Sequence, residues 1–104
     1  MKLVVIGYQT CEYYIDITDK LGQAAIEFDT IIAKDHQDLM FKVYKLGFNK
    51  KLAGVYGFTS PQVFLKLNKD VLWCLGGHDD TIRFGIIKIK EMIENDKKHE
   101  QIKY

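Results

Sequence analysis

The sequence has little of what marks several large protein classes. Its 104 residues include one proline and two cysteines, and 15 basic residues against 14 acidic ones leave a formal net charge of +1. Two cysteines are too few for a disulfide-stabilised extracellular scaffold, so we expect an intracellular, reducing, cytoplasmic setting. A nearly balanced charge argues against a nucleic-acid-binding protein that relies on a large basic surface.

Long apolar segments are absent as well. No stretch approaches the roughly 20 apolar residues that span a bilayer, and the apolar run near the N-terminus is too short for the core of a signal peptide. We therefore expect neither a membrane nor a nucleic acid as a partner. What the sequence does have is a hydrophobic content of 47%, which is ample for the core of a single domain over residues 1–104.

The spacing of apolar residues predicts an α/β fold with the element order β-α-β-α-β-β-α. Strands are expected at residues 2–7, 25–32, 63–67 and 71–75. Helices are expected at residues 12–21, from Asp35 or Asp38 to Gly47, and from 78–81 onward through Ile82, Ile86, Ile89 and Ile93. A helical crossover makes the first two strands parallel, and Asn68–Asp70 suggests a hairpin between the last two. A four-stranded mixed sheet with helices on both faces follows.

Cys11 lies between the first predicted strand and the first predicted helix. Beyond it the apolar spacing becomes helical, with Tyr14, Thr18 and Leu21 on one face. A thiol at a helix N-terminus faces unpaired N–H groups and the positive end of the helix dipole, which lower its pKa and make it a nucleophile. The alternative is that Cys11 is a small, buried apolar residue that happens to follow a strand.

Two later segments stand out beside Cys11. They are Thr59-Ser60-Pro61-Gln62-Val63-Phe64, before the third strand, and Gly76-Gly77-His78-Asp79-Asp80-Thr81, after the fourth. With a cysteine after the first strand and this order of elements, the chain resembles the glutaredoxins, which are small thioredoxin-fold proteins. The resemblance covers nearly the whole chain. It implies a thioredoxin-like fold and thiol–disulfide exchange that uses glutathione as co-substrate.

The resemblance assigns glutathione-binding roles to Tyr13, Ser60 and Pro61. It implies a cis Ser60–Pro61 bond that presents the backbone of Ser60 beside the thiol, where a peptide-like thiol compound can pair with it as a strand pairs with a sheet edge. It also implies that Tyr13 packs beside the substrate. The alternative for Pro61 is an ordinary trans proline at the first residue of a strand.

The same resemblance assigns the γ-glutamyl end of glutathione to the segment Gly77, His78, Asp79 and Asp80. The backbone N–H groups of His78 and Asp79 would hold its carboxylate, and the carboxylate of Asp79 or Asp80 would accept from its ammonium group. The alternative is that one of these aspartates caps the last helix. One aspartate can cap while the other binds, so the two interpretations are compatible.

The active-site motif departs from the family pattern. The family's usual Cys-Pro-Tyr-Cys is here Cys11-Glu12-Tyr13-Tyr14, so Tyr14 excludes a disulfide within the motif and dithiol chemistry with it. A monothiol route survives, in which Cys11 attacks a protein–glutathione mixed disulfide and free glutathione then releases it. Glutathione and glutathionylated or disulfide-containing proteins are the expected partners.

The charges around Cys11 depart from the family pattern too. Tyr8 stands where the family commonly has Lys or Arg, and the carboxylate of Glu12 raises the pKa of a neighbouring thiol. We therefore expect Cys11 to be less acidic than the cysteine of a typical glutaredoxin. A compensating cation could come from Lys42, Lys45, Lys50 or Lys51, which the sequence alone does not place.

No metal or cluster is expected in this chain. A glutaredoxin subgroup with Cys-Gly-Phe-Ser binds a bridging iron–sulfur cluster, but this motif has neither that glycine nor that serine, and Glu12 and Tyr14 would crowd a cluster. His78 has no Cys or His partner at ligand spacing. Cys74 is expected to be a buried, inert thiol, too far from Cys11 to resolve it.

Two hypotheses of different classes follow. The first is a glutathione-dependent thiol–disulfide oxidoreductase that uses the single cysteine Cys11. The second is a redox-inactive thioredoxin-fold binding or scaffold protein, which is suggested by Tyr8, Glu12 and Tyr14 because each replaces a group that the chemistry uses.

Overall fold

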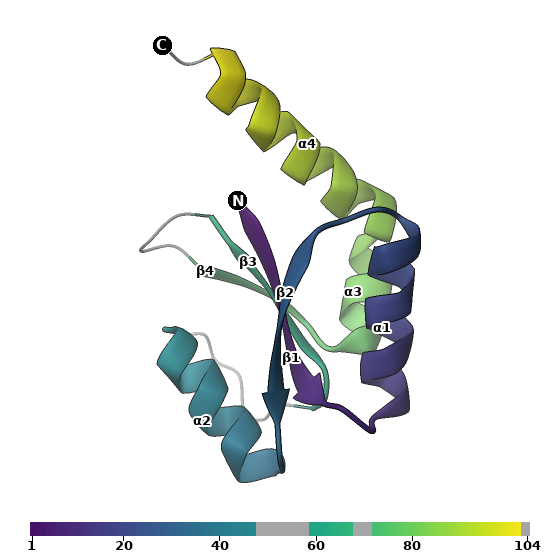
Figure 1. Cartoon of the computed structure of the whole chain (residues 1–104), viewed down its shortest axis with the longest axis vertical. Coiled ribbons are helices and arrows are strands. Elements are labelled where there is room, and N and C mark those ends of the chain that lie inside the picture. The colour runs from purple at the N-terminus through teal and green to yellow at the C-terminus, as the bar shows by residue number, and fades with distance from the viewer. Residues whose placement is uncertain (48–58, 68–71, 103–104) are drawn as a thin grey trace.

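The computed structural model describes residues 1–47, 59–67 and 72–102, and its elements follow the order β1–α1–β2–α2–β3–β4–α3–α4 (Figure 1). The strands are β1 (Lys2–Tyr8), β2 (Phe28–Ala33), β3 (Gln62–Lys66) and β4 (Leu72–Gly76). The helices are α1 (Glu12–Gln23), α2 (His36–Leu46), α3 (His78–Phe84) and α4 (Ile86–Ile102).

The four strands form one mixed sheet in the order β2–β1–β3–β4. β1 and β2 run parallel, with Leu3 opposite Phe28, whereas β1 and β3 run antiparallel, with Val5 opposite Val63. β3 and β4 are antiparallel as well. The predicted mixed sheet, with a parallel crossover followed by an antiparallel pair, is therefore confirmed. The predicted turn at Asn68–Asp70 lies outside the described residues.

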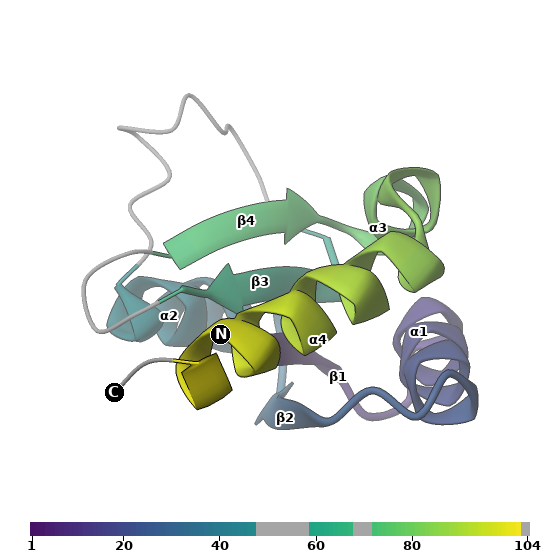
Figure 2. The same ribbon diagram turned by 90° about the horizontal axis from the view of Figure 1, so that it is seen from above.

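The helices cover both faces of the sheet, as Figures 1 and 2 show together. Because successive side chains of a strand point to opposite faces, the apolar run of β1 supplies both cores. The core beneath α1 and α4 contains Leu3, Val5, Tyr14, Ile17, Leu21, Ile26, Val63, Leu65 and Ile89. The core beneath α2 contains Val4, Ile6, Ala33, Leu39, Val43 and Phe64.

The prediction of one continuous last helix was wrong. The segment forms two helices, α3 and α4, which are separated at Gly85. Gly85 has φ 109° and ψ 121°, a conformation that glycine adopts readily because it has no Cβ. The isoleucine spacing continues across the break, and for this reason the sequence pattern alone predicted a single helix.

Two other predicted bounds shift by a few residues. α1 continues to Gln23, and its buried face contains Ile17, whereas Thr18 is only half-buried. β2 begins at Phe28 and not at Ala25, since Ala25 has φ 58° and its N–H donates to the Gly22 carbonyl in the turn that ends α1. The alternating pattern extended the strand into this turn.

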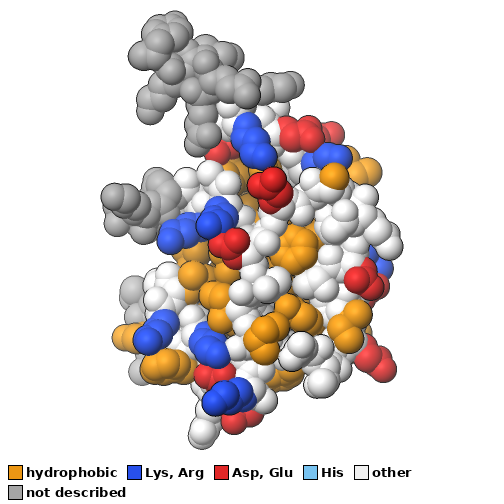
Figure 3. All heavy atoms as spheres, in the orientation of Figure 1, with side chains coloured by type: hydrophobic (Ala, Val, Ile, Leu, Met, Phe, Trp, Pro, Cys, Tyr) orange, Lys and Arg blue, Asp and Glu red, His pale blue; other side chains and the backbone are white. Residues whose placement is uncertain are grey.

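Charged side chains of both signs are interspersed over the face seen in Figure 3, between hydrophobic groups. The basic groups on this face do not form a continuous area, in keeping with the nearly balanced charge of the sequence. Within the described part of the chain, none of the helices combines the length and apolar character needed to cross a bilayer.

Candidate functional site

Cys11 is the N-cap residue of α1. Its backbone is extended (φ −75°, ψ 125°), and its carbonyl accepts the first helical hydrogen bond from the Ile15 N–H at 3.0 Å. An N-cap side chain normally accepts from the second and third N–H groups of the helix, which have no partner within the helix. Here those groups belong to Tyr13 and Tyr14, and they lower the pKa of the Cys11 thiol although its side chain makes no capping hydrogen bond.

The surroundings of Cys11 favour its thiolate. Burial raises the pKa of the thiol, but the Ser60 hydroxyl and the N–H groups of Tyr14 and Tyr13 lower it, and the net effect is a pKa below the ordinary value. Glu12 opposes this with a smaller, raising effect. As a thiol, Cys11 donates to the Ser60 carbonyl oxygen, 3.6 Å from Sγ. The predicted effect of the helix N-terminus on the pKa is thus present, and so is that of Glu12.

Tyr8 supplies no positive charge to the thiolate. Burial raises the pKa of its phenol, and the charges of Asp35 and Cys11 raise it further, which keeps the phenol neutral. Two of the lysines proposed to compensate are engaged elsewhere: Lys42 with Asp38 and the Ile32 carbonyl, and Lys45 over the Phe41 ring. The other two, Lys50 and Lys51, lie outside the described residues.

Ser60 lies against Cys11, and the Ser60–Pro61 peptide bond that follows it is cis. The Tyr8 N–H donates to the Ser60 Oγ atom at 3.0 Å. Because this contact occupies one lone pair of the hydroxyl, the hydroxyl proton is free to point toward the sulfur. Ser60 therefore contacts Cys11 through two groups, its carbonyl toward the thiol and its hydroxyl toward the thiolate.

Removing the Ser60 hydroxyl is expected to make Cys11 less acidic. A hydrogen bond to a charged group is worth about 1.5 kcal/mol or more, so in Ser60→Ala the midpoint of Cys11 alkylation against pH should rise by about one pH unit or more. The measurement is the rate of iodoacetamide alkylation between pH 5 and 9. Ser60→Thr keeps a hydroxyl and should retain the wild-type midpoint. Equal midpoints in wild type and Ser60→Ala would contradict the assignment.

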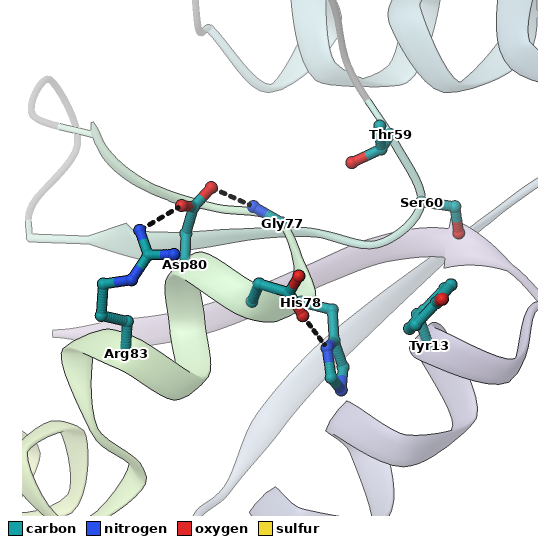
Figure 4. A pocket seen from close by; sticks show the side chains of 8 residues that line it. Tyr13, Thr59, Ser60, Gly77, His78, Asp80 and Arg83 are labelled. Atoms are coloured by element: carbon teal, nitrogen blue, oxygen red, sulfur yellow. Dashed lines mark hydrogen bonds and ion pairs between the residues drawn. The ribbon is translucent and has the colours of Figure 1, made fainter.

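A cavity of about 470 Å³ opens beside Cys11, between the start of α1, the Thr59–Ser60 turn and the start of α3 (Figure 4). It is lined by Tyr13, Thr59, Ser60, Gly77, His78, Asp79, Asp80 and Arg83. Six of the eight predicted site residues therefore share one cavity. The other two, Cys11 and Pro61, are not part of its lining, and Cys11 borders it through Ser60.

The two aspartates of the cavity have different partners. Asp80 accepts from the Gly77 N–H at 3.3 Å and lies 3.6 Å from Arg83, so its carboxylate caps α3 (Figure 4). Asp79 has an exposed carboxylate that contacts the His78 ring at 2.8 Å. Of the two alternatives left open by the sequence, capping is the role of Asp80, and Asp79 is the more exposed of the two aspartates.

His78 has a structured environment that the sequence did not reveal. Its ring lies between two carboxylates, with Nε2 2.6 Å from Asp16 on α1 and Nδ1 2.8 Å from Asp79. The hydrogen bond with Asp16, followed by that with Asp79, raises the pKa of His78. Lys20 lies 2.6 Å from Asp16, and Lys20 first and His78 second lower the pKa of that carboxyl.

These shifts predict how stability depends on pH. Because the pKa of His78 is raised in the folded state, its contribution is complete below the ordinary value of 6.5 and is lost as the pH rises through the folded value. Urea unfolding should therefore give a larger free energy at pH 6 than at pH 8.5. In His78→Gln this difference should shrink. An identical pH dependence in wild type and His78→Gln would contradict the raised pKa.

The comparisons with known proteins show which fold these helices and strands form. A scan against protein-family models finds no match, and a search of curated proteins finds no significant match. Among solved structures, the solution structure of glutaredoxin from Brucella melitensis matches with a TM-score of 0.50 and 18% identity, over 93% of this chain and 86% of that chain. The chain has the glutaredoxin fold. This confirms the thioredoxin-like architecture expected from the sequence.

Within this glutaredoxin fold, sequence reasoning missed three residues of the cavity and its surroundings. Asp16 contacts His78 from α1, Arg83 pairs with Asp80, and Thr59 lines the cavity next to Ser60. A signal existed for two of them. Asp16 lies three residues after Tyr13 and Arg83 three after Asp80, a spacing that places side chains on one helix face.

The second cysteine lies apart from the cavity of the glutaredoxin fold. Cys74 on β4 is half-buried on the α2 side of the sheet, 3.8 Å from the Gln62 side-chain oxygen. Burial raises the pKa of its thiol, which disfavours the reactive thiolate. Among the described residues, no group of three or more His, Cys, Asp and Glu side chains is placed to hold a metal ion.

Proposed function

We propose that this chain is a monothiol oxidoreductase that removes glutathione from glutathionylated proteins, with Cys11 as its nucleophile. One observation carries the proposal: the thiol of Cys11, the N-cap residue of α1, contacts Ser60, which also lines the 470 Å³ cavity. A nucleophile and a cavity suited to a small peptide-like ligand thus meet at one residue. The glutaredoxin fold supports the redox class.

The cavity offers groups that fit a glutathionyl moiety. The backbone of Ser60 can pair with the peptide part of the ligand, as a strand pairs with a sheet edge. The N–H groups of His78 and Asp79 can hold the γ-glutamyl carboxylate, and the exposed Asp79 carboxylate can accept from its ammonium group. Tyr13, which is 57% exposed, can pack against the ligand.

The reaction has two exchange steps. In the first, the Cys11 thiolate attacks the glutathione sulfur of the mixed disulfide, which forms a Cys11–glutathione disulfide and releases the protein thiolate, which takes up a proton. In the second, the thiolate of a free glutathione attacks the sulfur of the bound one. Oxidised glutathione leaves and the Cys11 thiolate returns. Each step needs one attacking thiolate, so Tyr14 in place of a second cysteine does not block the route.

The test is to incubate the protein with oxidised glutathione and to weigh the intact chain. Wild type and Cys74→Ser should each gain one glutathionyl group, and Cys11→Ser should gain none. Turnover of a glutathionylated peptide should likewise disappear in Cys11→Ser. If wild type gains no adduct across the neutral pH range, the oxidoreductase proposal fails and the binding-protein alternative takes its place.

A further inference from the structure

The His78 side chain joins two walls of the cavity. It is the first residue of α3, and it contacts Asp16 on α1 at 2.6 Å and Asp79 on its own helix at 2.8 Å. The Tyr13 ring, also on α1, lies 5.2 Å from the His78 ring at an interplanar angle of 56°. In Figure 4 the ring of His78 extends from α3 toward the helix that carries Tyr13. One side chain therefore connects the Tyr13 wall with the Gly77–Asp80 wall.

The contacts of this ring favour a positive charge. A neutral imidazole donates from one nitrogen only, whereas an imidazolium donates from both, and both nitrogens face a carboxylate. Burial opposes the charged form less than the two hydrogen bonds favour it, and the pKa of His78 is raised. Loss of the proton would leave one carboxylate facing a lone pair of the ring.

The charge of His78 decides the balance of charge in the cavity. With a protonated ring, the lining has two cations, His78 and Arg83, and two anions, Asp79 and Asp80. With a neutral ring, the lining has one net negative charge. A glutathionyl group has two carboxylates and one ammonium group, so it is itself anionic, and like charges in a partly enclosed cavity repel.

We propose that the His78 side chain is a positioning residue for the glutathionyl group, which fixes the Tyr13 wall relative to the Gly77–Asp80 wall and balances the charge between them. The role rests on the proposed function and deepens it. It concerns affinity and not sulfur chemistry, because the described groups that shift the pKa of Cys11 are Ser60, Tyr13, Tyr14 and Glu12, and His78 is not among them.

A pH dependence of binding follows from this role. On α1, Asp16 and Tyr13 face His78, and Lys20 lies beside Asp16. On α3, Asp79 faces the His78 ring. Imidazole is the side chain of this set whose charge normally changes near neutral pH. Affinity for the anionic ligand should therefore fall as the pH rises from 6.5 through the raised pKa of His78.

The test measures binding without sulfur exchange. S-methylglutathione has no disulfide, so its Kd by calorimetry reports affinity alone. A partly exposed ion pair is worth about 0.2–1 kcal/mol, so His78→Gln and Asp16→Asn should each raise this Kd about 1.4- to fivefold at pH 6.5. The double variant should show less than the product of the two effects. His36→Gln, the same substitution at an exposed histidine of α2, should leave the Kd unchanged.

Turnover separates positioning from a general structural role. With a glutathionylated peptide, His78→Gln should raise KM by the same factor, leave kcat and the alkylation midpoint of Cys11 unchanged, and remove the rise of KM between pH 6.5 and 8.5. An unchanged Kd in His78→Gln, with the Cys11 adduct still formed by wild type, would overturn the positioning role alone. A wild type that neither binds S-methylglutathione nor forms the adduct would overturn the proposed function and this role with it.

Discussion

Replacing Gly7 with alanine is expected to lower the free energy of unfolding by about 1–3 kcal/mol, the usual range for overpacking a buried site. Gly7 is buried in β1, and a Cβ atom there would lie 2.5 Å from the Tyr14 ring and 2.9 Å from Ser60 Oγ. The ring cannot retreat, because Tyr14 is only 8% exposed and packs into the core beneath α1 and α4. The measurement is urea unfolding of wild type and Gly7→Ala.

The chain offers a matched control in Gly22→Ala. Gly22 lies in α1, and a Cβ atom added there would meet nothing within 4 Å. Alanine is the better helix former, so this variant should gain about 0.5–1 kcal/mol. If the clash with the ring is the cause, Gly7→Ala should cost less in a Tyr14→Leu background, with a coupling energy of about 0.5–3 kcal/mol. Similar effects of Gly7→Ala and Gly22→Ala would contradict the close approach of Tyr14.

The contact between Gly7 and Tyr14 illustrates what the sequence could not predict. Alternation and helical spacing located β1 and α1 and placed Cys11 at their junction, since those signals depend on neighbours in the chain. They say nothing of which side chain of α1 lies over which residue of β1. From the sequence, Tyr14 was therefore interpreted only as the residue that replaces the second cysteine of the motif. In the structure its side chain is also part of the core beneath α1 and α4.

The residues of the cavity show the same limit, because the sequence does not tell which side chains of different elements meet. The resemblance to glutaredoxins selected Tyr13, Ser60 and the Gly77–Asp80 segment, and these residues do line one cavity. It did not select Asp16, whose spacing of three from Tyr13 indicates a shared helix face but not the contact with His78, 62 positions away in the sequence. The break at Gly85 was missed for a different reason: glycine permits an unusual φ angle without requiring it, and the isoleucine spacing on both sides is helical.

Replacing Tyr14 with cysteine is expected to convert the site from monothiol to dithiol chemistry. Position 14 is the third residue of α1 and Cys11 is its N-cap, and residues three apart on one helical turn lie within the about 7 Å Cα separation that a disulfide allows. Oxidised glutathione should first react at Cys11. The thiol introduced at position 14 should then attack Cys11 and release glutathione, so the final mass is two hydrogens below the reduced form, with no adduct.

This substitution is also expected to have the largest cost in stability. Truncating a large buried aromatic side chain costs about 3–5 kcal/mol, a substantial part of the roughly 5–15 kcal/mol that keeps a domain folded. Tyr14→Ser removes the same ring without adding a thiol, so it should be destabilised similarly and still retain one glutathionyl group on Cys11. Urea unfolding and intact mass on the same samples separate the two effects. A lasting adduct on Cys11 in folded Tyr14→Cys would show that the two positions do not face each other, and would contradict the placement of both at the start of α1.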